Sequence, residues 1–177
     1  MPRATNLLKK AEALIPRPLI LGIIGGGDPP LEALRAAEQV GELAAKRGAI
    51  ILCGGLGGVM EAACKGAAKA GGLTLGVLPG TDRDTANPYV AIPIVTAMST
   101  ARNAIIVRSA DALIAIDGSF GTLTEIAYAL DLGRKVLLLN SWPVDRLGVD
   151  GDLFEKVSTP QGAVDRALVL AEENRRR

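Results

Sequence analysis

The chain has 177 residues, which is enough to bury a sizeable core, and only 3% of them are aromatic, so we expect that core to consist of Ala, Val, Ile and Leu. The formal net charge is +1, which gives no indication of a nucleic-acid or membrane-surface binder. The absence of histidine excludes histidine general bases, histidine metal ligands and Ser-His or Cys-His nucleophiles, and we expect no metal site.

Along the chain, short apolar runs alternate with longer stretches that carry apolar residues at helical spacing. Glycine and proline residues bound most of these elements, as they do at turns and helix ends. The predicted strands cover residues 18–24, 49–53, 73–78, 90–96, 112–116 and 135–140. The predicted helices cover residues 31–46, 59–70, 99–108, 123–132 and 159–173, and residues 141–158 are expected to be irregular.

The predicted strands are apolar throughout, as strands buried on both faces are. Pro93 interrupts the fourth strand, so we expect that strand to lie at an edge of the sheet or to be irregular. No shift in composition divides the chain. We therefore predict one domain over residues 1–177 with a Rossmann-like α/β fold, in which a doubly wound, mostly parallel sheet carries helices on both faces.

Four turns that contain glycine follow predicted strands and fall on the edge where the strands end, which is where such sheets bind ligands. Glycine lets the main chain approach a ligand closely. Although the need for a short turn explains any one of these glycines, their gathering on one edge favours a ligand site. The candidate binding residues are Gly25, Gly26, Gly55, Gly57, Gly118, Ser119, Gly121 and Thr122.

The pattern of these turns favours a phosphate-bearing ligand. No Gly-Lys-Ser/Thr sequence completes a Walker A loop, and Pro30 replaces the third glycine of the dinucleotide fingerprint. We expect helices that start at residues 57–58, 99 and 122 to point their positive ends toward one region, where an anion gains hydrogen bonds from free N–H groups. A mononucleotide or a similar small molecule fits these features.

Arg102 is the cation expected in this region. With Ser99 as the N-cap, Arg102 falls in the first turn of its helix, where a positive charge opposes the helix dipole. A small local cost of this kind points to a role elsewhere, and the planar guanidinium is suited to gripping a phosphate. The alternative is an exposed arginine whose small penalty is tolerated.

Glu125 has two interpretations that the residues leave open. The run Thr122-Leu-Thr-Glu125 matches a capping box, in which Thr122 caps the helix and Glu125 bonds back to the N–H group of the cap. Alternatively, the carboxylate accepts a sugar hydroxyl or stabilises positive charge on a ribose ring, as carboxylates do in glycoside hydrolysis. In the second interpretation, the turn holds the phosphate and the acid faces the sugar beside it.

Features outside the predicted site bear on the compartment. Cys53 and Cys64 lie in apolar runs, and we expect both thiols to be buried and reduced. The first six residues lack an apolar segment behind their charges, and no apolar run is long enough to span a bilayer. We therefore expect a cytoplasmic location without membrane contact. The final three arginines, residues 175–177, are expected to form a frayed, solvated tail.

Four motifs, in this order, resemble the LOG superfamily, which is often labelled "possible lysine decarboxylase" and includes the LONELY GUY cytokinin-activating phosphoribohydrolases. The resemblance extends over about residues 18–140. Within this superfamily, the chain most resembles the branch of molybdenum cofactor carrier proteins, through residues 86–89 (Ala-Asn-Pro-Tyr) and 101–103 (Ala-Arg-Asn). The four motifs are Gly54-Gly-Leu-Gly-Gly-Val-Met60, residues 71–80, residues 101–111 and Gly118-Ser-Phe-Gly-Thr-Leu-Thr-Glu125.

The resemblance implies a Rossmann-like fold and a homodimer or homotetramer. In the hydrolases of the superfamily, a Pro-Gly-Gly-x-Gly-Thr-x-x-Glu motif binds phosphate and supplies a catalytic glutamate, and an arginine acts together with that glutamate. Glu125 matches the glutamate, and Arg102 matches the arginine. Asp117, Ser119 and Asn103 stand where those enzymes have Pro, Gly and Lys. A lysine decarboxylase is not supported, because the chain lacks a pyridoxal-phosphate lysine motif.

Two functions follow from this resemblance, and a third is more remote. The first is a binding protein for a phosphate-bearing small molecule, with the molybdenum cofactor as a candidate carried ligand and Arg102 assisting the residue 118–122 turn. The second is hydrolysis of the N-glycosidic bond of a nucleoside 5′-monophosphate, with Arg102 and Glu125 as catalytic residues. The third is a DNA-processing protein of the DprA type, against which the near-neutral charge and scarce aromatic residues argue.

Overall fold

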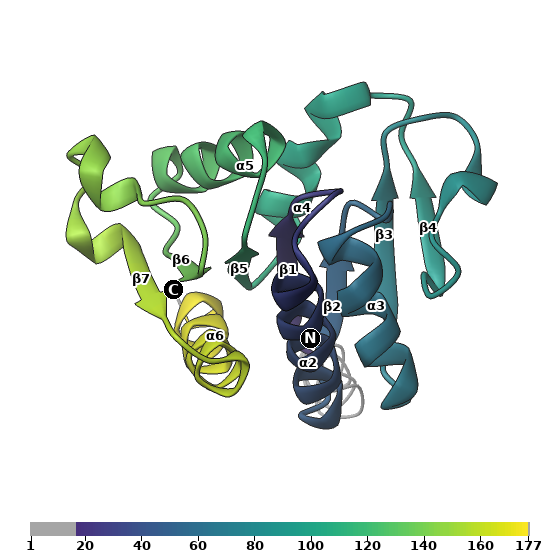
Figure 1. Cartoon of the computed structure of the whole chain (residues 1–177), viewed down its shortest axis with the longest axis horizontal. Coiled ribbons are helices and arrows are strands. Elements are labelled where there is room, and N and C mark those ends of the chain that lie inside the picture. Colours follow the sequence, from purple (N-terminus) through teal and green to yellow (C-terminus); the bar gives the residue numbers. More distant parts are fainter. Residues whose placement is uncertain (1–16, 177) are drawn as a thin grey trace, which may run out of the picture.

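The computed structural model describes residues 17–176, so the predicted absence of a signal peptide at the first six residues lies outside it. In this part of the chain, seven strands form one fully parallel sheet in the order β4-β3-β2-β1-β5-β6-β7 (Figure 1). The strands are β1 (Ile20–Gly25), β2 (Ile50–Cys53), β3 (Thr74–Leu78), β4 (Ile92–Val95), β5 (Ala112–Ile116), β6 (Val136–Leu139) and β7 (Phe154–Val157). The α-helices are α2 (Leu31–Lys46), α3 (Val59–Lys69), α4 (Asn103–Ser109), α5 (Phe120–Asp131) and α6 (Pro160–Arg175).

The predicted Rossmann-like fold is confirmed, and the sheet is entirely rather than mostly parallel. The chain builds outward from β1 through β2 and β3 to β4, and then returns to place β5 on the other side of β1. The strand order therefore reverses between β1 and β5. In doubly wound sheets, the turns on the two sides of such a reversal leave in opposite directions and open a crevice at the carboxyl ends of the strands.

Helices cover both faces of the sheet, as predicted. Side chains of α2, α3 and α6 form one apolar cluster with the sheet, and side chains of α4 and α5 form a second cluster on the opposite face. In residues 17–176, the buried apolar side chains are Ala, Val, Ile, Leu and Cys, which confirms the core expected from the scarcity of aromatic residues. None of the described helices combines the length and the apolar character that crossing a bilayer requires.

Helices α2 and α3 pack at main-chain contact because glycine occupies two positions in their interface. A Cβ atom at Gly41 would lie only 1.9 Å from the carbonyl oxygen of Ala63, and one at Gly66 only 1.9 Å from that of Glu38. The ion pair between Lys65 and Glu38, with its N and O atoms 3.0 Å apart, closes the solvent side of this contact. The two helices therefore form a thin, close layer over β1 and β2.

The edges of the sheet confirm one prediction and correct another. β4 is an edge strand, where the missing N–H group of Pro93 removes no hydrogen bond that the interior of the sheet needs. Residues 141–158 are not irregular throughout, because β7 pairs with β6 at the opposite edge after two short 3-10 turns, Val144–Leu147 and Gly151–Leu153. Its four residues, Phe-Glu-Lys-Val, are half-exposed and mix charge with apolar groups, so they carry no buried-strand pattern.

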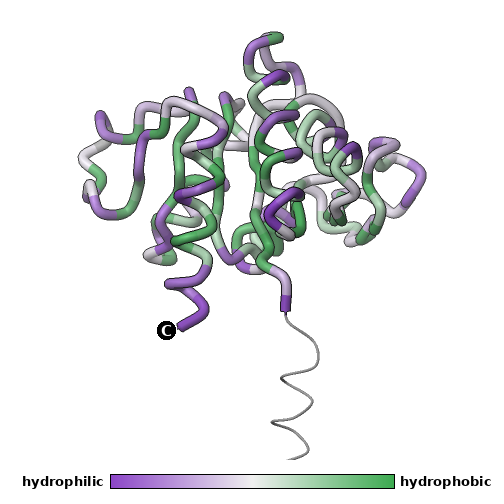
Figure 2. The backbone as a smooth tube through the Cα atoms, turned by 90° about the horizontal axis from the view of Figure 1, so that it is seen from below, coloured by the Kyte–Doolittle hydropathy of each residue, from purple (hydrophilic) through white to green (hydrophobic). Residues whose placement is uncertain are grey.

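The end of α6 is anchored rather than frayed. The guanidinium of Arg175 pairs with the carboxylate of Asp111, with a closest distance of 2.6 Å, and also donates to the carbonyl oxygens of Arg17 and Pro18. The expected solvated tail is therefore wrong for Arg175, and Arg177 lies outside the described residues. Figure 2 shows that the end of α6 is hydrophilic, which is compatible with an anchor made of charged groups.

The glycine contact between α2 and α3 makes a test of helix packing. We expect Gly41→Ala to lower the free energy of unfolding by about 2–3 kcal/mol, because the added methyl group collides with the main chain of α3. Gly151→Ala is the matched control, since a Cβ atom there meets nothing within 4 Å, and its effect should stay within about 0.5 kcal/mol. Urea unfolding measures both, and equal stabilities would contradict the close packing.

Candidate functional site

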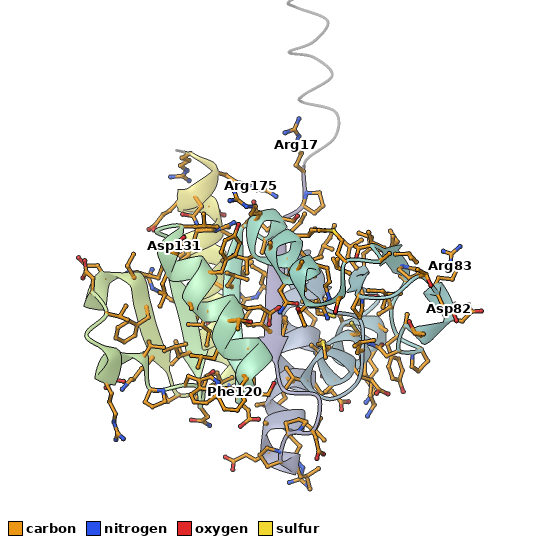
Figure 3. The ribbon with its side chains drawn as sticks, turned by 90° about the horizontal axis from the view of Figure 1, so that it is seen from above. Arg17, Asp82, Arg83, Phe120, Asp131 and Arg175 are labelled. Carbon is orange, nitrogen blue, oxygen red and sulfur yellow. The ribbon has the colours of Figure 1, made fainter. Side chains whose placement is uncertain are left out.

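A pocket lies at the carboxyl ends of β1, β2, β3 and β5, on the side of the sheet that α4 and α5 cover. Its volume is about 340 Å³, which is within the range of small-molecule sites. Figure 3 views the molecule from above Figure 1 and shows Phe120 at the start of α5, with Asp131 at the other end of the helix. The pocket is lined by Ile23, Ile24, Gly25, Gly27, Gly54, Leu56, Met60, Pro79, Ser99, Thr100, Arg102, Asn103, Ser119, Gly121, Thr122 and Glu125.

The pocket brings together many of the residues that the sequence singled out. Arg102 from the segment after β4 meets Glu125 from α5, and the turn after β5 supplies its own residues beside them. The predicted residues that line the pocket are Gly25, Arg102, Ser119, Gly121, Thr122 and Glu125. Gly26, Gly55, Gly57 and Gly118 lie in the adjoining turns but do not line it.

The start of α3 faces another turn of the protein and not the pocket. The N–H group of Val59 donates to the carbonyl oxygen of Gly26 at 3.0 Å, and a Cβ atom at Gly58 would lie 2.3 Å from the same oxygen. The first amide of α3 is therefore occupied by the protein itself. This contact explains why glycine is needed at residue 58, and it occupies the first amide of one of the three helix starts that we expected to face an anion.

The segment before α4 differs from the predicted helix. Residues Ser99–Arg102 form a 3-10 turn, and α4 begins only at Asn103. Ser99 has a φ of 51°, in the left-handed region, and the residue at the N-cap position of the turn is Met98. The predicted N-cap at Ser99 is therefore wrong, because a capping serine has an extended backbone. Ser99 and Thr100 also line the pocket, although neither was among the candidate binding residues; their hydroxyl side chains in the segment that follows β4 were a usable signal.

Arg102 is buried, with only 8% of its surface exposed, so the alternative of a tolerated surface arginine is wrong. Its Nη1 atom donates to Oδ1 of Asn103 at 2.5 Å, and its Nη2 atom donates to the carbonyl oxygen of Gly54 at 3.4 Å. A Cβ atom at Gly54 would lie 2.4 Å from Nη2, so only glycine leaves room for the guanidinium. The side chain is thus built into the wall between the ends of β2 and α4.

The capping box predicted at Thr122 and Glu125 is not formed. Helix α5 begins at Phe120 with Ser119 as the N-cap residue, so Thr122 already lies inside the first turn. Glu125 lies a full turn further along the helix, where it cannot reach the N-cap N–H group. Its carboxylate is buried and points toward Arg102, with Oε1 of Glu125 3.9 Å from Nη1 of Arg102. The capping interpretation of Glu125 is therefore wrong, and Glu125 lines the pocket.

Burial raises the pKa of Glu125 to about 7, from an ordinary value of 4.5, and the positive charge of Arg102 only partly opposes this shift. Burial also lowers the pKa of Arg102, against the opposing influence of Glu125, but an arginine remains charged at neutral pH. Near pH 7 the carboxyl group therefore exists as a mixture of its neutral and charged forms. It can donate a proton or a hydrogen bond, as well as accept one.

Two polar atoms at the pocket have no partner in the protein. Within residues 17–176, Nε of Arg102 and Oγ1 of Thr122 are the buried side-chain nitrogen and oxygen atoms without a hydrogen bond. No side chain caps the first turn of α5, which also leaves N–H groups of that turn without side-chain partners. A buried donor without a partner is costly, so this arrangement favours a ligand that supplies acceptor oxygen atoms.

The segment after β6 holds the pocket turn in place. Trp142 donates from Nε1 to the carbonyl oxygen of Ser119 at 3.2 Å. The hydroxyl of Ser141 donates to the carbonyl oxygen of Asp117 at 2.5 Å. Asp117 has a φ of 51°, a left-handed conformation that costs energy in any residue but glycine. Residues predicted to be irregular thus support the turn, and two contacts with its main chain offset the strain at Asp117.

Comparisons with known proteins show the family of the chain. The model of the SLOG cluster4 family matches residues 18–173. An uncharacterized protein of Archaeoglobus fulgidus is 49% identical over 148 residues, which are 84% of this chain and 93% of that protein. The cytokinin riboside 5′-monophosphate phosphoribohydrolase LOG5 of Arabidopsis thaliana is 30% identical over 136 residues, which are 76% of this chain and 59% of that enzyme.

Solved structures give the same picture. The molybdenum cofactor binding protein of Rippkaea orientalis superposes with a TM-score of 0.83 at 36% identity, covering 87% of this chain and 98% of that one. The molybdenum cofactor carrier protein of Chlamydomonas reinhardtii superposes with a TM-score of 0.79 at 36% identity, over 89% of this chain and 99% of the carrier. The DNA processing protein A of Streptococcus pneumoniae, at 19% identity and a TM-score of 0.66, shares the fold alone.

The raised pKa of Glu125 predicts a pH-dependent effect of Glu125→Gln. The folded protein binds the Glu125 proton more tightly than the unfolded chain does, so this contribution to stability is complete below about pH 4.5 and is lost through about pH 7. As the pH rises from about 4.5 to about 7, the free energy of unfolding of the wild type should fall by up to about 3 kcal/mol relative to that of Glu125→Gln. Urea unfolding of both proteins at a series of pH values measures the difference. A difference independent of pH would show that the carboxyl titrates normally.

Proposed function

Since the chain belongs to the SLOG cluster4 family, we propose that it is a binding protein for a phosphate-bearing small molecule, either a nucleotide or a molybdopterin-type cofactor. Similar proteins of both kinds support the proposal, namely molybdenum cofactor carriers among the solved structures and phosphoribohydrolases among the sequence relatives. This chain covers nearly the full length of the molybdenum cofactor carriers and is 36% identical to them, whereas it covers 59% of LOG5 at 30% identity. We therefore put a carrier-like role first.

The observation that carries this proposal is the pair of buried, unpartnered polar atoms at the pocket, one on Thr122 in the first turn of α5 and one on Arg102 just before α4. Oγ1 of Thr122 and Nε of Arg102 can both donate to phosphate oxygen atoms, and the open first turn of α5 adds main-chain N–H donors. In the proposed complex, Gly118, Ser119, Gly121 and Thr122 hold the phosphate, and Arg102 assists. Gly118 has a φ of 140° and would clash with Thr122 if it carried a Cβ atom, so it sets the shape of this cradle.

A molybdopterin-type cofactor carries a phosphate and a flat pterin, and as cargo it would place the phosphate in the same cradle. The lining beyond the cradle is mainly apolar, with Ile24, Leu56 and Met60 near the wall that Arg102 forms. An apolar lining with a few convergent polar groups is typical of sites for flat heterocycles. The donor set therefore fits the phosphate of either a nucleotide or a pterin.

Hydrolysis of the N-glycosidic bond in a nucleoside 5′-monophosphate is the alternative function, and one observation favours it. The carboxyl group of Glu125 has a pKa of about 7, so part of it is protonated at neutral pH and can serve as a general acid toward a leaving base. Arg102, 3.9 Å away, would stabilise the carboxylate that remains. Against this alternative, Asp117, Ser119 and Asn103 replace residues of the hydrolase motifs, and Glu125 is the pocket's sole lining carboxylate in the described chain.

We also propose that the protein is a homo-oligomer that associates through the exposed face of β4. Ile92, Ile94 and Met98 are each 39–46% exposed, and the short helix α4 leaves this part of the sheet uncovered. Residues 86–101 contain no charged side chain. A second copy of the chain matches such a surface without charge repulsion, whereas a charged partner would find no complement on it. The patch adjoins the pocket through Ser99 and Thr100.

The phosphate proposal predicts a selective effect of Thr122→Val. This change keeps the shape of the side chain and removes the unpartnered hydroxyl, so we expect the affinity for AMP or a pterin phosphate to fall about tenfold or more while stability does not fall. Thr124→Val on the same helix is the matched control, because the Thr124 hydroxyl bonds to the carbonyl oxygen of Gly121 and is exposed. Calorimetric titration of the three proteins measures the affinities.

The same titrations separate the two functions when they are followed by an assay for free adenine. A carrier binds AMP and leaves it intact. Adenine release by the wild type that disappears in Glu125→Gln would establish the hydrolase and overturn the carrier. If neither AMP nor the pterin phosphate binds the wild type, both proposals fail together.

The oligomer proposal predicts that Ile94→Glu dissociates the assembly, because a carboxylate would be buried opposite its own symmetry copy. Val169→Glu is the matched control, since Val169 is 46% exposed on α6, away from β4. Light scattering coupled to gel filtration gives the mass of each protein. A wild type that elutes as a monomer, or an Ile94→Glu protein that keeps the mass of the wild type, would contradict the proposal.

A further inference from the structure

The two cysteines of the chain lie against each other in the core. Cys53 is the last residue of β2 and Cys64 lies in α3, and their Sγ atoms are 3.5 Å apart. Both side chains are fully buried. In the sequence the two thiols are separated by ten residues, which include the whole turn from Gly54 to Gly58. The expectation of buried thiols is confirmed, and their direct contact is a feature that the sequence did not indicate.

The surroundings of the two thiols are unequal. Cys53 accepts a hydrogen bond from the N–H group of Gly55 at 3.4 Å, and its Sγ atom lies beside Cys64. The hydrogen bond from Cys64 lowers the pKa of Cys53, with smaller help from Gly55 and the charge of Arg102, although burial opposes the shift. The same contact and burial raise the pKa of Cys64. The hydrogen bond from the N–H group of Gly55 favours the thiolate of Cys53, so we take Cys53 as the attacking thiol.

The pair lies directly beneath the pocket. Gly54, the residue after Cys53, lines the pocket and accepts from Arg102, and Met60 lines it one turn before Cys64. The Sγ atom of Cys53 is 3.9 Å from the carbonyl oxygen of Met60. Gly54 and Met60 therefore lie both at the pocket and next to the thiol pair.

We propose that Cys53 and Cys64 are a redox modification site, at which hydrogen peroxide or another small peroxide converts the two thiols into a reversible intramolecular disulfide. The juxtaposition of the two sulfur atoms under the pocket carries this inference. It goes beyond the proposed binding function and does not depend on it, because the thiols and the peroxide are sufficient for the reaction.

The reaction balances in two steps. The thiolate of Cys53 attacks one oxygen of the peroxide, the O–O bond breaks, and the released hydroxide takes up the proton that Cys53 lost, which leaves a sulfenic acid and one water. The sulfur of Cys64 then attacks the sulfur of Cys53, the S–O bond breaks, and the leaving hydroxide takes the proton of Cys64. In total, two thiols are oxidised, one peroxide is reduced, and two waters form.

The geometry allows this bond with small movements. A disulfide holds its sulfur atoms about 2.0 Å apart, so the two Sγ atoms must approach each other by about 1.5 Å. β2 is paired on both sides, with β1 and β3, so any remaining movement falls on α3. The bond would close a short loop around the Gly54–Gly58 turn and restrict the unfolded chain.

The test treats the reduced wild type with hydrogen peroxide, unfolds it and alkylates the remaining thiols. We expect both thiols to become unreactive together, one peptide pair joined through Cys53 and Cys64 in the mass spectrum, and full recovery with dithiothreitol. The melting temperature should rise by about 3–10 °C on oxidation. Because the wild type itself is tested, no substitution can obscure the result by unfolding the protein.

Two variants test the unequal roles. In Cys64→Ser, Cys53 should stop at a sulfenic acid that dimedone traps, whereas in Cys53→Ser, Cys64 should remain a thiol under the same peroxide exposure. The proposal is overturned if both wild-type thiols remain available for alkylation after peroxide, or if the oxidised cysteines bridge two chains instead of one. Equal trapping by dimedone in the two variants would overturn the assignment of Cys53 as the attacking thiol.

Discussion

The withdrawal of one guanidinium and one carboxyl group from water determines the character of the pocket. Arg102 and Glu125 are both buried, yet their closest atoms are 3.9 Å apart, so their attraction only partly offsets the loss of hydration. The proton on Glu125 relieves part of this cost, which is why its pKa lies near 7. A bound anion would relieve more, because it offers acceptors to the Nε atom of Arg102. The site is therefore incomplete as a set of protein groups and favours an occupant that carries negative charge.

Small residues make it possible for such a site to rest on a rigid base. In a core without large rings, glycine brings neighbouring helices to main-chain contact, as Gly41 does against Ala63 and as Gly66 does against Glu38. On the other face of the sheet, α4 has only seven residues, and the apolar side chains Ile92 and Ile94 of β4 stay exposed.

The sequence predicted those features that depend on periodicity and on chain stops. Apolar strands between glycine turns predicted the parallel sheet, and Pro93 predicted β4 at an edge. The meeting of Arg102 with Glu125 was expected from the resemblance to the LOG superfamily. The sequence failed where a local pattern has more than one physical use. Thr122-x-x-Glu125 has the residues of a capping box, but the helix starts earlier and both side chains turn inward. Contacts between distant segments, such as Cys53 with Cys64, have no local signature at all.

The anchor at Arg175 has a topological consequence. It ties the last turn of α6 to the carbonyl oxygens of Arg17 and Pro18, so the two ends of the described chain meet at the sheet margin remote from the pocket. The order of the strands in space then does not depend on where the polypeptide is cut. A circular permutant that links residue 176 to residue 17 and opens in the exposed turn at Arg83–Thr85 would retain every strand pairing and leave the ligand cradle unbroken.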